Sequence, residues 1–209
     1  MIDNLNKNIT IIGICGSLRS TSYTRMALKI ALKGAEESGV NTELIDLRDY
    51  DLVFCDGGEN EENYPEDVER LRKKVFDAEG IILGTPEYHG GVSGVLKNAL
   101  DLLGFREFEG KMVGLIGVSG GEMGAVNALN SLRNIGRSLR AWVLPSQVSI
   151  PQVAKAFDSY GNVKSKDMEK RLKHVGRRVA RFASLHTSQS AKNFLRAWEE
   201  APKNPGGHK

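Results

Sequence analysis

The side chains best suited to chemistry in this chain are the hydroxyl groups of one short segment. Residues 16–24 read Gly-Ser-Leu-Arg-Ser-Thr-Ser-Tyr-Thr, and six of the nine carry a hydroxyl. The segment follows an apolar run and leads into a pattern of helical period. The unpaired N–H groups and partial positive charge of a helix N-terminus stabilise an anion. Because Ser and Thr add donors and Arg19 adds a forked guanidinium, we predict that the segment binds a phosphate monoester.

Two better-known phosphate loops are absent from the sequence. The chain contains neither G-x-G-x-x-G, which lets bare backbone approach a pyrophosphate, nor G-x-x-x-x-G-K-[ST], which holds a nucleoside triphosphate. A mononucleotide with a terminal phosphate suits the hydroxyl-rich segment better. The simpler alternative is that one Ser or Thr caps the first helix. A cap uses one hydroxyl rather than six, so we favour the phosphate site.

Two further segments are bracketed by glycine. Residues 84–93 read Gly-Thr-Pro-Glu-Tyr-His-Gly-Gly-Val-Ser, and residues 119–124 read Ser-Gly-Gly-Glu-Met-Gly. Glycine lets a ligand approach the backbone closely, and Tyr88 or His89 can cover the face of a ring. We predict that these two segments and residues 16–24 frame one flat ligand that carries a phosphate tail.

The elements that must position these segments alternate along the chain. Short apolar runs predict strands at residues 9–15, 42–45, 80–83, 112–118 and 141–144. Apolar residues at three- and four-residue spacing predict helices at residues 24–38, 66–78, 93–103, 124–139 and 167–186. Continuously apolar strands joined by helices indicate a doubly wound α/β fold, a five-stranded parallel sheet with helices on both faces. Ligands bind such sheets beyond the carboxyl ends of the strands, where the strand order reverses.

Composition places the chain among ordinary globular proteins. Its 209 residues are 40% hydrophobic and 26% charged, which excludes collagen-like and disordered classes. The two cysteines, Cys15 and Cys55, form neither a disulfide framework nor a metal motif, so we predict no metal site and a cytoplasmic location. The first residues do not resemble a signal peptide, and no apolar run is long enough for a membrane helix, so we expect no membrane association.

Charge is distributed unevenly along the chain. Residues 164–209 carry twelve Lys and Arg against four Asp and Glu, although the whole chain has a net charge of only +3. A basic segment can bind nucleic acid. Its cations fall around the polar side of an amphipathic helix, however, with no aromatic platform between them. We therefore predict a solvated helix face and no nucleic-acid partner.

The glycine-bracketed motifs resemble those of a known family. G-S-L-R-S-T-S-Y-T after a first strand, T-P-E-Y-H-G-G-V-S-G-V-L-K-N-A-L-D after the third and S-G-G after the fourth are similar to the NADPH-dependent FMN reductases, which are flavodoxin-like quinone, chromate and azo-dye reductases. The likeness spans about residues 9–185. It implies a bound FMN and two-electron transfer from NADPH or NADH to a quinone, flavin, azo compound or metal oxyanion.

The resemblance also implies roles for residues by position. The FMN phosphate would be held by Ser17, Arg19, Ser22, Tyr23 and Thr24. The ring would be lined by Pro86, Glu87, Tyr88, His89 and Gly90, and its other edge would meet Ser119, Gly120 and Gly121. Many relatives have Asn at the position of Thr24, and Thr24 in this chain is expected to make a weaker phosphate contact than Asn does.

Three alternatives stay open at this point. The chain could be a flavodoxin-type electron carrier that does not oxidise NAD(P)H itself. His89 could donate a proton to the acceptor, or could serve only as a hydrogen-bonding or stacking group. Beyond the FMN-binding domain, residues 1–186, the tail at residues 187–209 could be mobile or could form a short docking helix.

The resemblance further implies a homodimer or homotetramer. A flavin that lies on loops leaves one face open to solvent, and relatives cover that face with a second subunit. The predicted helix at residues 92–103 and the loop at residues 103–108 are the candidate contacts.

Overall fold

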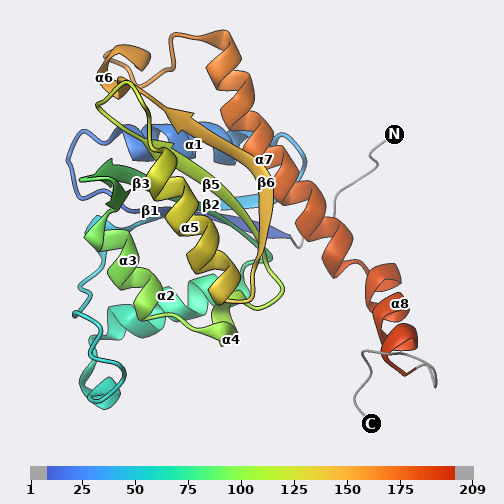
Figure 1. Ribbon diagram of the computed structural model, residues 1–209. Helices are drawn as coiled ribbons and strands as arrows, with labels where there is room; N and C mark the ends of the chain where they lie inside the picture. Colours follow the sequence, from blue (N-terminus) through green and yellow to red (C-terminus); the bar gives the residue numbers. More distant parts are fainter. Residues whose placement is uncertain (1–8, 201–209) are drawn as a thin grey trace.

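The computed structural model describes residues 9–200 and contains a parallel sheet covered by helices on both faces (Figure 1). The parallel strands are β1 (Thr10–Cys15), β2 (Asn41–Asp46), β3 (Gly80–Tyr88), β5 (Met112–Val118) and β6 (Trp142–Ile150). They lie in the order β2-β1-β3-β5-β6, and the short β4 (Gly91–Val92) pairs antiparallel with β3. The predicted five-stranded, doubly wound α/β fold is confirmed.

The five long helices predicted from the sequence are present. They are α1 (Tyr23–Glu36), α2 (Glu66–Asp77), α3 (Gly94–Asp101), α5 (Val126–Ser138) and α7 (Lys166–Thr187). Shorter elements fill the connections. These are α4 (Phe105–Phe108), α6 (Val153–Ala156), α8 (Gln189–Glu199) and the 3-10 turns η1 (Leu47–Asp49) and η2 (Glu61–Asn63).

Two apolar cores, one on each face of the sheet, explain why the strand sequences are continuously apolar. Along β1, Ile11 and Cys15 pack beneath α1 and α7, whereas Ile12 and Ile14 pack beneath α2, α3 and α5. All four side chains are fully buried. Because successive strand residues point to opposite faces, a strand covered on both sides needs apolar residues at every position.

Helix α1 is fixed in place by unusually close backbone contact with α7. A Cβ atom at Gly176 would lie 1.8 Å from the carbonyl oxygen of Ala31, and one at Gly34 would lie 2.3 Å from that of Lys173. Only glycine fits at these two crossing points. The N-terminus of α1, which follows the hydroxyl-rich segment, therefore has a rigid support.

The structure differs from the sequence predictions at strand ends. Strand β3 continues to Tyr88, so residues 84–88, predicted as a loop, are extended and partly paired. Strand β6 continues to Ile150 through an irregularity in its pairing with β5 and a run of polar residues. Hydrogen bonding to a neighbouring strand, rather than local apolarity, defines these extensions.

The C-terminal region forms a helix that projects from the body (Figure 1). Helix α8 follows α7 after Ser188, and the exposed side chains of Phe194 and Leu195 lie on it. Part of the predicted tail is thus helical, and a docking role for it stays a prediction. Residues 201–209 of that tail and residues 1–8, where a signal peptide was not expected, lie outside the described residues. No helix within residues 9–200 is long and apolar enough to span a membrane.

Candidate functional site

The three predicted segments meet at the carboxyl end of the sheet. Strand β1 pairs with β2 on one side and β3 on the other, so the strand order reverses between β1 and β3. The register places Cys15 beside Gly84 and Pro86 beside Val118, which brings the residues that follow β1, β3 and β5 to one edge. This is the switch point at which ligands bind in doubly wound sheets.

The segment after β1 presents a run of uncommitted backbone donors. None of the N–H groups of residues 17–24 donates a hydrogen bond to another part of the described chain. The next N–H groups are satisfied, since that of Arg25 donates to Ser22 Oγ at 3.2 Å and that of Met26 donates to the Ser22 carbonyl at 3.1 Å. Consecutive free N–H groups at the start of a long helix form an anion site, and here they follow a fixed strand.

The side chains of this segment divide into buried and exposed groups. Ser17, Ser22 and Thr24 are at most 3% exposed, and Ser22 serves as the N-cap of α1. Arg19 is exposed, and its side chain forms no hydrogen bond or ion pair with the described residues. The ring of Tyr23 packs against Phe157 with 5.5 Å between centroids, so its backbone N–H is what it offers to a ligand.

Arg25, which the sequence analysis did not select, holds the segment in shape. Its Nε donates to Asp46 Oδ2 at 2.5 Å, and its Nη1 donates to the carbonyls of Arg19 and Ser20 at 3.2 and 3.1 Å. The hydrogen bond to Asp46 raises the pKa of the Arg25 guanidinium. Its Nη2 is buried and has no partner among the described residues. The sequence did contain a signal for this role. A cation in the first turn of a helix is unfavourable to the helix dipole, so Arg25 at that place indicates a carboxylate nearby.

The segment after β3 is a tight hairpin. Tyr88 pairs with Gly91, and the two residues of the turn have positive φ angles, 51° at His89 and 77° at Gly90. Two consecutive left-handed residues are the mark of a type I′ turn, for which His-Gly is a compatible sequence. The turn leaves the side chains of Tyr88 and His89 exposed, whereas Pro86 is buried.

Short polar contacts tie this hairpin to the first segment. Ser93 Oγ donates to the Gly16 carbonyl at 2.6 Å, and the Gly16 N–H donates to the Gly84 carbonyl at 2.9 Å. The Ser93 N–H in turn donates to Thr85 Oγ1 at 3.1 Å. A Cβ atom at Gly16 would lie 2.6 Å from the Cβ of Leu96, so this crossing requires glycine. The relative position of the two segments is therefore fixed by buried hydrogen bonds.

The segment after β5 presents open backbone. A Cβ atom at Gly120 would meet nothing within 4 Å, and Gly121 donates its N–H to Ser119 Oγ at 3.1 Å. Glu87 in the hairpin connects to the helix that follows, because its carboxylate accepts a hydrogen bond from the Ala128 N–H in the first turn of α5 at 2.9 Å. The Glu87 carboxylate thus holds the hairpin beside the third segment.

Cys15 lies beneath the site but is not built for redox chemistry. Its side chain is fully buried, and burial raises the pKa of its thiol. A protonated, buried thiol is a poor nucleophile. This position agrees with the packing role expected of a free cysteine at a strand end.

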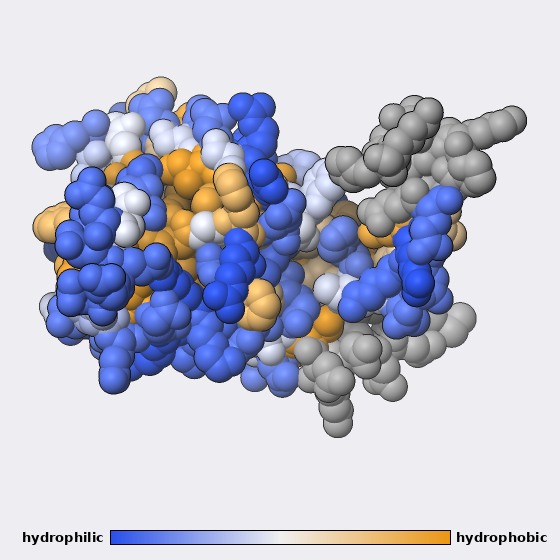
Figure 2. Space-filling view, turned by 90° about the horizontal axis from the view of Figure 1, so that it is seen from below, coloured by the Kyte–Doolittle hydropathy of each residue, from blue (hydrophilic) through white to orange (hydrophobic). Residues whose placement is uncertain are grey.

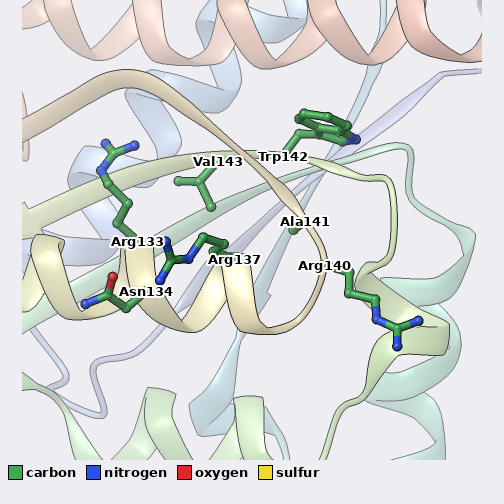
Figure 3. Close-up of a pocket in the computed structure, with 7 residues that line it drawn as sticks. All are labelled: Arg133, Asn134, Arg137, Arg140, Ala141, Trp142 and Val143. Atoms are coloured by element: carbon green, nitrogen blue, oxygen red, sulfur yellow. The ribbon is translucent and has the colours of Figure 1, made fainter. Parts of the chain in front are cut away.

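A hollow of about 550 Å³ lies elsewhere, at the beginning of β6 (Figure 3). It is lined by Arg133, Asn134, Arg137, Arg140 and residues 141–143. Two of its guanidinium groups already have partners. Arg133 donates to the Leu144 carbonyl and to the Gln147 side chain, and Arg140 stacks over the Phe105 ring. The start of a strand is also the wrong end of a doubly wound sheet for the main site.

With β4 set aside and the other strands counted in sequence, the strand order is 2-1-3-4-5, the order of flavodoxin-like folds. The switch point of this sheet carries the free N–H groups described above. The chain belongs to the NADPH-dependent FMN reductase family, whose model matches residues 9–155. The resemblance predicted from the motifs is confirmed. The protein is an FMN-dependent NAD(P)H oxidoreductase with NADPH as co-substrate.

Individual relatives agree with this assignment. The chain is 41% identical over 140 residues to an FMN-dependent NADPH-azoreductase of Staphylococcus saprophyticus, covering 65% of this chain and 73% of that protein. It is 31% identical to the NADPH-dependent FMN reductase ArsH of Shigella flexneri, covering 85% and 69%. Among solved structures it resembles FerB, a flavoenzyme NAD(P)H:acceptor oxidoreductase from Paracoccus denitrificans, with a TM-score of 0.71 and 25% identity over 85% and 98% of the two chains.

Proposed function

We propose that this reductase holds FMN by its phosphate on the backbone N–H groups of residues 17–24 and passes electrons from NADPH to a small organic acceptor. The observation that supports this most directly is that those N–H groups have no acceptor within the described chain. An anion of the size of a phosphate would satisfy several of them at once. The residues present therefore fit the group that the family implies.

Each segment has a distinct part in this proposal. Arg19 supplies the mobile positive charge for the phosphate, while Arg25 keeps the backbone of residues 19 and 20 in place. Residues 86–90 and 119–121 offer flat backbone to the ring. When bound, FMN supplies the hydride and electron chemistry, so the protein needs to bind, orient and exclude water rather than supply an acid–base pair.

His89 acts in this proposal through its backbone. Its φ angle of 51° forms the turn, and its side chain is exposed at the tip of the hairpin. A positioned proton donor needs neighbours that hold its ring, and the described residues make no hydrogen bond to the His89 side chain. We therefore assign His89 to ring binding rather than to proton transfer.

The acceptor that we propose is a planar azo compound or quinone. Several of the relatives are named as azoreductases, the exposed Gly120 and Gly121 after β5 offer open backbone, and Tyr88 in the hairpin is exposed. The test is anaerobic oxidation of NADPH by FMN-loaded protein, with and without methyl red or a benzoquinone. Turnover by the protein alone supports a reductase. Turnover only after a separate reductase is added would support the flavodoxin-type carrier and contradict the proposal.

A second copy of the chain is the proposed cover for the site. Figure 2 shows apolar side chains gathered in a hollow on the lower side of the molecule, surrounded by hydrophilic ones. Exposed apolar residues also border the candidate site, among them Met123, 86% exposed, and Val126. The apolar side of the predicted contact helix is less available than expected, because Leu96 and Leu100 are buried within the chain. Light scattering should give a multiple of the 22.9 kDa chain mass, and a monomer at micromolar concentration would exclude this arrangement.

We further propose a cytoplasmic location. Both cysteines, Cys15 and Cys55, are free in the structure. Unpaired cysteines in a chain of this size suit a reducing compartment.

A further inference from the structure

A second hollow of about 540 Å³ begins at the phosphate segment and leads away from it along α1. Ser20, Ser22 and Arg25 belong both to this groove and to the candidate FMN site. Its other walls are the start of α7 and the connection around Tyr160. The groove therefore opens directly beside the predicted FMN phosphate.

One face of α1 forms the floor of the groove. Ser22, Met26, Lys29 and Lys33 line it and are spaced by three or four residues, which places them on the same side of the helix. At 1.5 Å per residue, the face from Ser22 to Lys33 is about 16 Å long. Partly buried Met26 provides an apolar floor, and the lysines stand along it at intervals of about one turn.

The charges that line the groove are mainly positive. Arg25, Lys29, Lys33 and Lys173 face a single carboxylate, that of Glu169. Lys33 pairs with Glu36, and Lys173 pairs with Glu169 and with Glu37. Lys29 forms no ion pair with the described residues, and the Nη2 of Arg25 is buried without a partner. The groove therefore retains uncommitted positive charge close to the phosphate segment.

An exposed aromatic ring stands at the wall of the groove on a rigid turn. The Asp158 carboxylate accepts hydrogen bonds from the N–H groups of Tyr160 and Asn162 at 2.9 and 2.8 Å. Gly161, with a φ angle of 86°, packs this turn onto Met26 of α1. The side chain of Tyr160 is nonetheless 89% exposed. A fixed turn that displays an unused ring is suited to stack with a planar ligand.

From these features we propose that the groove binds the adenosine 2′-phosphate end of NADPH. The 2′-phosphate would lie against Lys29 and the adenine ring would stack on Tyr160, while the nicotinamide end reaches back toward the ring segments of the FMN site. This inference rests on the proposed function, because it requires NADPH to meet FMN at that site. It assigns the preference for NADPH over NADH to Lys29 and the adenine contact to Tyr160, and both residues lie outside the family motifs.

The direct test uses adenosine 2′,5′-bisphosphate and AMP as probes, measured by titration calorimetry on the full chain. The bisphosphate should bind at least about tenfold more tightly than AMP, since a charge-assisted contact is worth about this factor. Lys29→Ala should abolish the difference, and Tyr160→Ala should weaken both probes. Lys192→Ala, which removes an exposed lysine on α8, is the matched control. Equal affinities for the two probes, or no effect of Lys29→Ala, would overturn the inference.

Kinetics separate this inference from the proposed function. Lys29→Ala should raise the KM for NADPH about tenfold and leave kcat, the KM for NADH and FMN affinity unchanged. Both residues are exposed, so neither variant should disturb folding. If Lys29→Ala keeps the full preference for NADPH, or Tyr160→Ala keeps full affinity for both probes, while FMN binds and turnover continues, the groove assignment is wrong and the reductase stands. If the wild-type chain fails to bind FMN, the proposed function itself fails.

Discussion

The hydroxyl of Ser93 donates a 2.6 Å hydrogen bond to the carbonyl of Gly16 and so joins two segments that are 77 residues apart in sequence. The same oxygen accepts the Leu96 N–H at 3.2 Å as the N-cap of α3. One buried hydroxyl thus fixes the start of a helix and the distance between the phosphate segment and the hairpin. Together with the hydrogen bond from the Gly16 N–H to the Gly84 carbonyl, this link sets the relative position of the two segments on which the predicted FMN site depends.

Ser93→Ala should therefore affect both stability and cofactor binding. The variant loses the N-cap of α3 and leaves the buried Gly16 carbonyl without its donor. These two losses should lower the free energy of unfolding by about 1–3 kcal/mol. FMN affinity should fall about tenfold, measured by fluorescence titration. Ser165→Ala removes the N-cap of α7, where Ser165 Oγ accepts the Met168 N–H, and is the matched control. The control should lose stability without losing FMN affinity, and equal FMN affinities in both variants would contradict the role given to Ser93.

Arg25→Ala should weaken FMN binding although Arg25 is not expected to contact FMN. Its removal frees the carbonyls of residues 19 and 20 and leaves Asp46, only 14% exposed, without its ion-pair partner. We expect about 1–3 kcal/mol of destabilisation and a tenfold or greater loss of FMN affinity. Arg25→Lys should rescue little, because an ammonium lacks the fork that reaches three acceptors.

The control for Arg25 is Arg177→Ala. Arg177 pairs with Glu37 at 2.7 Å, but its side chain is 47% exposed, so its loss should cost less than about 1 kcal/mol. FMN affinity should not change. Full rescue of binding by Arg25→Lys would mean that charge alone, and not the hydrogen-bond geometry, matters at this position.

His89→Asn should retain kcat within about threefold. Asn adopts the left-handed conformation at little cost, so the hairpin should persist, whereas His89→Val should destabilise it because β-branched residues resist a positive φ angle. The measurement is kcat against pH with a fixed acceptor. A drop of a hundredfold or more in the kcat of His89→Asn would instead identify His89 as a proton donor.

The partly buried side chain of Lys111 should make the free energy of unfolding depend on pH. Its Nζ donates to the carbonyls of Val75 and Phe76 at the end of α2, and burial lowers its pKa from 10.5 to about 8. Between pH 8 and 10.5 the unfolded chain therefore binds more protons at this residue than the folded chain, so its contribution to the free energy of unfolding rises with pH. We expect a gain of about 1–3 kcal/mol across this window.

The control for the Lys111 effect is Lys111→Met, which keeps the aliphatic volume and removes the titrating group. Urea denaturation at pH 7.5, 9 and 10.5 should show a steeper rise for the wild-type chain than for the variant. Identical pH profiles would show that the ammonium group is as well stabilised in the folded chain as in water.

The sequence predicted the parts of the fold that depend on local pattern. Residues 112–118 form β5 with the predicted bounds, because a strand buried on both faces must be apolar at every position. The extension of β3 to Tyr88 was not predicted, since its pairing partners on β5 and β4 lie elsewhere in the sequence. The adjacency of residues 16–24, 84–93 and 119–124 followed from the parallel order of the strands, and the structure places these three segments at one edge of the sheet.

Arg25 shows what sequence reasoning could not reach. Arg25 supports the phosphate segment through its ion pair with Asp46 at the end of β2. The pairing of β2 with β1 brings Asp46 to that position. The groove along α1 was missed for a similar reason. Lys29 and Tyr160 are 131 positions apart, and only the packing of Gly161 on Met26 brings their segments together.

The affinities for FMN and for riboflavin, which has the same ring but no phosphate, show directly whether the chain holds the phosphate. If the N–H groups of residues 17–24 hold the phosphate, FMN should bind at least about a hundredfold more tightly, because several charge-assisted hydrogen bonds are lost with riboflavin. Titration calorimetry of flavin-free protein with each ligand gives both affinities. Equal affinities for the two flavins, or no binding of FMN, would contradict the account.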